Sequence, residues 1–317
     1  MRRILICVLL ILITSAAFIN AQDENSALVP LSELSRRNQL PQLIQTANLL
    51  LASAKLTPIG QGVVFNYLGY AYQQRGDFRN ATAYYEKALA IFERDGQHPS
   101  EYATTLGSLA TLYAETGQVD TAKHVLLRSL HLFGKDDTHH AEIAMIWNDL
   151  ATIAVDRHSS HEAHKCMARS LAESQLASSI SANELATLKT TQASIAEMDG
   201  DLYSAISEYQ RSLALWKQSH GDQHPDTAWL YVLLGDAYLQ AGEIAKAREI
   251  TGRGLSILET SAGRHSTRFL NAELTYAKVL DASGAHDEAS ALRKDAETNL
   301  KTRTQSSREE ISVSALR

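Results

Sequence analysis

Three histidines and a cysteine stand close together in the stretch VDRHSSHEAHKC, residues 155–166. They are His158, His161, His164 and Cys166, and imidazole nitrogen and thiolate sulfur are the ligands that zinc prefers. A zinc site needs three or four such ligands on one side of the ion. The stretch therefore raises the hypothesis of a metal site, to which His124 could contribute if a neighbouring helix brings it close to His164.

Helical geometry argues against a metal site that uses all of these side chains. On a helix that advances about 100° per residue, His161 and His164 lie about 60° apart, whereas Cys166 lies about 140° from His161 and about 160° from His164. Cys166 is therefore not expected to join them. The main prediction is therefore a protein without cofactor or metal. The alternative function is metal binding or metal sensing by the His158–His164 cluster, with His161, His164 and His124 as ligands.

The same stretch belongs to a repeat of 41 or 42 residues. Six alanines mark it, and a second column of small residues stands twelve positions before each of them. The alanines are Ala81, Ala122, Ala163, Ala205, Ala247 and Ala289, and the earlier column holds Gly69, Ala110, Ala151, Ala193, Gly235 and Ala277. Larger apolar residues recur three and four apart on both sides of a short polar break. This pattern predicts two amphipathic helices per unit, packed closely where the small residues meet.

Glycine marks the break between the two helices in five units, at Gly76, Gly117, Gly200, Gly242 and Gly284. A helix often ends in a left-handed residue, a conformation that glycine adopts at least cost. In the third unit His158 occupies this position, and histidine is among the few other residues that visit positive φ fairly readily. The repeat therefore explains His158 without a metal.

The starts of the first helices carry their own signals. Pro58, Pro99 and Pro225 each stand where a first helix should begin, a position that tolerates proline because its amide has no helical partner. Ser181 followed by Glu184 predicts a capping box at the matching place in the fourth unit.

The pattern resembles the tetratricopeptide repeat, through segments such as FNYLGYAYQQRGDFRNATAYYEKAL and YVLLGDAYLQAGEIAKAREITGRGL. The unit length and the loops GQHPSEYA and GDQHPDTA are similar to the subclass found in kinesin light chains. The resemblance implies an all-α, right-handed α-solenoid of about six helix-turn-helix repeats with capping helices at both ends.

The expected organisation follows from the register. Residues 1–21 are a signal peptide, 22–57 a helical N-terminal cap, 58–300 the repeat array, and 301–317 a polar tail or capping helix with its own box at Ser307 and Glu310. The units are expected near 58–98, 99–139, 140–180, 181–222, 223–264 and 265–300. The array and its caps fill the chain after the signal, so no enzymatic domain is expected.

The signal peptide is predicted from MRRILICVLLILITSAAFINAQ, in which two arginines precede a short apolar run and small residues. Cleavage could follow Ala17 or Ala21, which would make the protein periplasmic or secreted. The run is shorter than the roughly 20 apolar residues of a spanning helix. An uncleaved N-terminal membrane anchor is the alternative, and only in that case is a membrane contact expected.

Net charge limits the partners. Removal of residues 1–21 takes two of the 30 basic residues and none of the 36 acidic ones, so the formal charge changes from −6 to −8. Because phosphate neutralisation drives nucleic-acid affinity, no nucleic-acid partner is expected. The mature chain keeps a single cysteine, so no internal disulfide can form.

The resemblance implies a concave face, lined by the first helices, that binds an extended peptide or a helix of a partner protein. Asn66 and Asn148 occupy the place where the family carries an asparagine that holds a peptide backbone. Acidic residues outnumber Lys278 on the predicted face, which favours a polar or basic partner steered by charge. The predicted binding residues are Asn66, Tyr70, Glu115, Asn148, Asp149, Thr152, Asp156, Glu197, Asp236 and Lys278.

Overall fold

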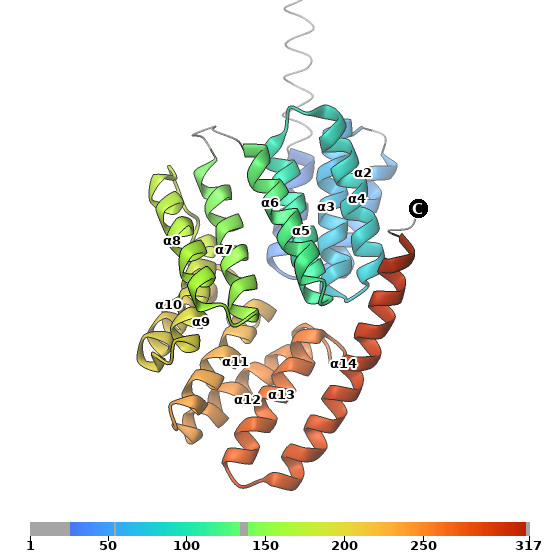
Figure 1. Cartoon of the computed structure of the whole chain (residues 1–317). Coiled ribbons are helices and arrows are strands. Elements are labelled where there is room, and N and C mark those ends of the chain that lie inside the picture. Colours follow the sequence, from blue (N-terminus) through green and yellow to red (C-terminus); the bar gives the residue numbers. More distant parts are fainter. Residues whose placement is uncertain (1–25, 54, 134–138, 315–317) are drawn as a thin grey trace, which may run out of the picture.

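A computed structural model describes residues 26–53, 55–133 and 139–314. The predicted signal peptide lies outside these residues. All regular elements of the described part are helices, which run in sequence along a curved array (Figure 1). Residues 26–36 are helical, and the elements that follow are α2 (Leu40–Ala52), α3 (Pro58–Gln74), α4 (Phe78–Asp95), α5 (Pro99–Glu115), α6 (Val119–Phe133), α7 (His140–Asp156), α8 (Ser160–Leu176), α9 (Ala182–Met198), α10 (Leu202–His220), α11 (Pro225–Gln240), α12 (Ile244–Ser261), α13 (Thr267–Ala282) and α14 (His286–Ser314).

From α3 onward the helices pack in sequential pairs, and each pair packs against the next. The pairs are α3/α4, α5/α6, α7/α8, α9/α10, α11/α12 and α13/α14. The first helices also contact one another from α3 to α9, and α11 contacts α13. The protein is therefore an all-helical solenoid.

The helix ends form as the sequence predicts. Proline is the first residue of α3, α5 and α11, and Ser181 and Glu184 make the expected capping box at α9. The five glycines of the break have positive φ, and His158 takes their place with φ 52°. The residue in the middle of the histidine stretch therefore ends α7, as the repeat requires.

Small residues allow the two helices of each unit to approach closely. All six alanines of the repeat column are fully buried. A Cβ at Gly235 would lie 2.0 Å from Thr251 Oγ1, so no side chain fits there. Seven residues after the alanine column, Ser170 and Ser212 each donate a 2.7 Å hydrogen bond to a carbonyl of the preceding helix. The small columns thus fix the helix spacing throughout the array.

One expectation about the C-terminus is wrong. The box at Ser307 and Glu310 predicts a new helix start, but α14 continues without interruption from His286 to Ser314. The segment contains neither glycine nor proline and is rich in residues that favour helix, so nothing stops the helix. Its extra length carries it to the other end of the array.

The two ends of the solenoid meet. Helix α14 packs against α4, as Figure 1 shows. The Asn38 side chain donates a 3.0 Å hydrogen bond to the Ser261 carbonyl, and Arg36 donates a 3.1 Å hydrogen bond to the Ser219 carbonyl. The N-terminal segment therefore contacts the fourth and fifth units, and the first unit contacts the last.

Candidate functional site

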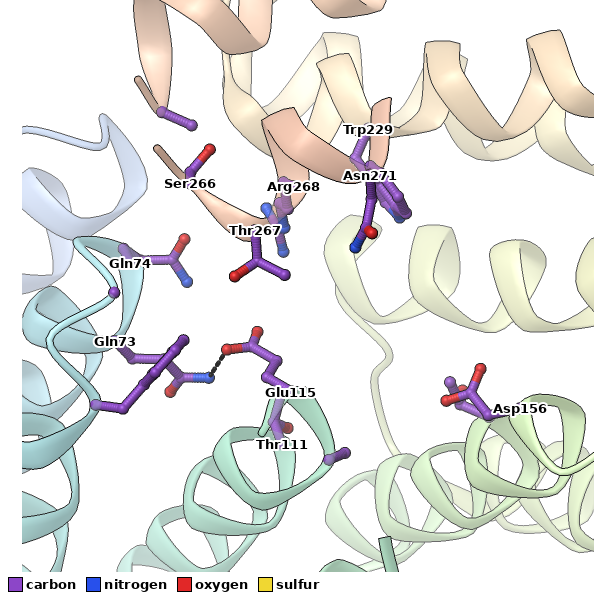
Figure 2. Close-up of a pocket in the computed structure, with 15 residues that line it drawn as sticks. Gln73, Gln74, Thr111, Glu115, Asp156, Trp229, Ser266, Thr267, Arg268 and Asn271 are labelled. Carbon is purple, nitrogen blue, oxygen red and sulfur yellow. Dashed lines mark hydrogen bonds between the residues drawn. The ribbon is translucent and has the colours of Figure 1, made fainter. Parts of the chain in front are cut away.

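A cavity of about 510 Å³ lies between the two ends of the solenoid. One wall comes from the last turns of α3, α5 and α7, and the other from the first turns of α11 and α13. Figure 2 shows Gln73, Gln74 and Glu115 on one side and Thr267, Arg268, Asn271 and Trp229 on the other. The volume is in the range of sites that hold small molecules or short peptide segments.

The first wall repeats one position of the unit. Gln74, Glu115 and Asp156 each stand two residues before the left-handed residue of their unit, so successive first helices present them side by side. Gln73 donates a 3.1 Å hydrogen bond to Glu115 Oε2 and accepts a 2.8 Å bond from the Tyr85 hydroxyl. The buried Gln73 amide thereby holds the exposed Glu115 carboxylate in place.

Arg268 is the one cation among the residues that line this cavity, and it is already paired. Its guanidinium contacts the Asp226 carboxylate at the start of α11. Burial alone would raise the pKa of Asp226, but the charge and hydrogen bond of Arg268, together with the charges of His224 and His220, lower that pKa overall. The same two charges act on Tyr70, whose pKa is raised to about 12 by burial and by Asp226. The pair therefore belongs to the joint between the ends.

Asp156 differs from Arg268 because it has no such partner. No hydrogen bond or ion pair reaches its carboxylate from the described residues, although its side chain is open to the cavity. The cavity wall keeps water from part of the exposed Asp156 side chain, and this desolvation raises its pKa, while the charge of His158 opposes the rise. The cavity thus contains a carboxylate whose charge the protein leaves largely uncompensated.

The predicted binding residues fall into separate groups. Glu115, Thr152 and Asp156 line the cavity, and Tyr70 lies beside the Arg268–Asp226 pair. Glu197, Asp236 and Lys278 form another network, in which the Tyr209 hydroxyl donates a 2.8 Å bond to Glu197 and Lys278 Nζ lies 3.3 Å from Asp236. This second network is not part of the cavity wall.

The two asparagines predicted to hold a peptide backbone are placed differently from each other. Asn148 is 1% exposed, whereas Asn66 is half-buried. The side-chain oxygens of both are buried and have no hydrogen-bond partner among the described residues. Beside Asn148, burial raises the pKa of the half-buried Asp149 to about 7, while a hydrogen bond from Asn148 opposes the rise. The backbone-holding role of both asparagines stays a prediction.

Sequence reasoning missed the second wall. Trp229, Thr267, Arg268 and Asn271 gave no signal, because the register shows which residues share a face but not which distant units meet. The curvature that joins α13 to α3 is the sum of small rotations between units. One sequence signal of this wall exists: Asp226 and Arg268 carry opposite charges and stand one period of 42 residues apart, which would have predicted their ion pair.

In the part of the chain that the structure describes, the histidine stretch is not arranged as the alternative metal site. His164 Nε2 lies 2.6 Å from Asp199 Oδ2, and Ser160 donates a 2.9 Å bond to the same carboxylate. These hydrogen bonds lower the pKa of Asp199. Within the described ranges, no three His, Cys, Asp or Glu side chains are gathered around one point, so His124, His161 and His164 are not brought together as ligands.

The fold is that of a helical repeat protein, and its cavity is large enough to hold a ligand. A family model described as tetratricopeptide repeat matches residues 61–135 and 184–260. Residues 61–135 and 184–260 are therefore tetratricopeptide repeats. No curated protein matches it. Among the described residues, no helix has the length and apolarity that crossing a bilayer requires.

Three solved structures illustrate the likeness. NprR in complex with its cognate peptide NprX is 17% identical, with a TM-score of 0.62, over 88% of this chain and 78% of that chain. A Rap protein complexed with competence and sporulation factor is 15% identical, with a TM-score of 0.61, over 90% of this chain and 99% of the other. Repeats described as those of a kinesin light chain from Podosopora anserina are 19% identical, with a TM-score of 0.46, over 66% and 98%.

Proposed function

We propose that this protein is a non-catalytic scaffold that binds a short segment of a peptide or partner protein in the cavity between its first three and last two units. The observation that carries the proposal is the cavity itself, which contains polar side chains from both ends of the solenoid that have no partner among the described residues. Gln74 and Asn271 offer amide donors and acceptors suited to a peptide backbone. NprR and the Rap protein are solved with a peptide and with a factor bound, which agrees with this use of the fold.

A selection experiment tests the proposal. Random short peptides displayed on phage are selected against residues 22–317, and the enriched peptides are synthesised and their affinities measured by calorimetry. Thr267→Trp, which fills the cavity from the start of α13, should weaken binding at least tenfold. The matched control is Tyr203→Ala, because Tyr203 is 88% exposed on α10, away from the cavity lining. Peptides that bind both variants equally well would place the site elsewhere and contradict the proposal.

We also propose that binding takes place after export. The basic residues, short apolar run and small residues of positions 2–21 support this proposal. Amino-terminal sequencing of the protein recovered from its producing cells should start at Phe18 or Gln22. A protein that starts at Met1 and sediments with membranes would instead support the N-terminal anchor.

A further inference from the structure

The cavity has an uneven charge. Its lining contains two carboxylates, Glu115 and Asp156, and a single cation, Arg268. Asp226 engages that cation from outside the lining, so Arg268 offers little attraction to an anionic ligand. The field inside the cavity is therefore negative, and a ligand that carries a carboxylate or phosphate would meet repulsion without compensation.

Asp156 is the focus of this field. Its carboxylate opens into the cavity and has no partner among the described residues, while Glu115 is held by Gln73. A carboxylate that lines a cavity is stabilised most by a ligand group that carries the opposite charge and also donates hydrogen bonds. An ammonium or guanidinium group supplies both.

Trp229 adds a second feature suited to a cation. It lies on the opposite wall and is half-buried, so part of its indole remains available to a ligand. The face of an indole ring attracts cations, and tryptophan is the most effective aromatic residue in this role. An alkyl stem of a lysine or arginine side chain would also cover the apolar part of the ring.

We infer that the ligand of the cavity presents a lysine or arginine side chain, which pairs with Asp156 and lies against Trp229, while Gln74 and Asn271 bind the neighbouring peptide backbone. This inference rests on the proposed function and adds the chemistry of the ligand to it. It sets a specificity for basic segments and excludes acidic ones.

The peptide selection gives the first test. Peptides selected on the wild-type protein should be enriched in lysine or arginine at one position, and the same selection on Asp156→Asn should lose the enrichment. The exposed position of Asp156 makes this substitution compatible with folding, which circular dichroism checks. If cavity-dependent peptides carry no basic residue, the inference is overturned while the proposed function stands. If no cavity-dependent peptide is found, both fail.

A double-mutant cycle gives the second test. The best peptide is compared with a version in which arginine is replaced by citrulline, which keeps the shape and removes the charge. On the wild-type protein the citrulline peptide should bind about tenfold more weakly, as expected for a charge-assisted pair. On Asp156→Asn the two peptides should bind equally. Equal binding of both peptides to the wild type, or an unchanged difference on the variant, would overturn the role of Asp156.

Discussion

Asp149 is a single residue whose charge state couples to folding. It is half-buried on α7, and burial raises its pKa from 3.8 to about 7. A raised pKa means that the folded protein binds the proton more tightly than the unfolded chain. The stabilisation is therefore complete below pH 3.8 and is lost as pH rises through the window up to about 7.

The substitution Asp149→Asn should remove this loss. At pH 8 the variant should be more stable than the wild type by roughly 1–2 kcal/mol, after the full effect of the shift is reduced for the exposed part of the side chain. At pH 4 the difference should nearly vanish, because the wild-type carboxyl is then neutral in the fold. Urea unfolding at both pH values measures this. A variant that is less stable at pH 8 would show that the carboxylate is compensated.

His224 shows how one side chain supports an element. It is 6% exposed, and its Nδ1 accepts a 3.2 Å hydrogen bond from the Asp226 amide, which caps α11. Burial lowers the pKa of His224 from 6.5 to about 4, although the charge of Asp226 opposes the shift. The ring of His220 lies 4.6 Å away, and burial lowers its pKa as well. Protonation would remove the cap and place two cations side by side.

The contribution of His224 to folding stability depends on pH with the opposite sign to that of Asp149. Because the unfolded histidine takes a proton more readily, stability is fully present above pH 6.5 and falls as pH drops toward 4. His224→Asn keeps a capping acceptor but does not titrate. Between pH 7 and pH 4 the wild type should therefore lose roughly 2–3 kcal/mol more than the variant. Equal losses in urea unfolding would contradict the lowered pKa.

The joint between two helices of one unit can be tested by overpacking. Ala205 is fully buried between α9 and α10, so Ala205→Leu should cost about 1–3 kcal/mol. Each unit of a solenoid depends mainly on its neighbours, so hydrogen exchange should rise around the fourth unit first. Ala214→Leu is the control, since Ala214 is exposed on the same helix. A uniform loss of protection along the array would contradict this locality.

The elements were largely predictable from the sequence, and the cavity was not. Pro58, His158 and Ser181 act through local chemistry, so their roles at helix ends follow from residue type and spacing. Glu115 and Asp156 followed from the register of the first helices. Trp229 and Arg268 could not be foreseen as their neighbours, because the meeting of distant units depends on rotations that accumulate along the whole array.

At the scale of the whole molecule, closure of the solenoid shapes the cavity. Arg36 and Arg37 both pair with Glu33, but only Arg36 is observed to donate to the Ser219 carbonyl in the last turn of α10. Arg36→Ala should therefore loosen the joint and weaken peptide binding about two- to fivefold, as the loss of one hydrogen bond predicts. Arg37→Ala should leave the affinity unchanged. Equal effects in calorimetry would show that closure does not control the site.

The proposed function requires that the ligand lies between the two ends of the array. A selected peptide that carries a photoreactive group is cross-linked to the protein, and the attachment points are mapped by mass spectrometry. Attachment is expected at the last turns of α3, α5 or α7 and also at the first turns of α11 or α13. Attachment confined to the outer helices α4, α6 and α8 would contradict it.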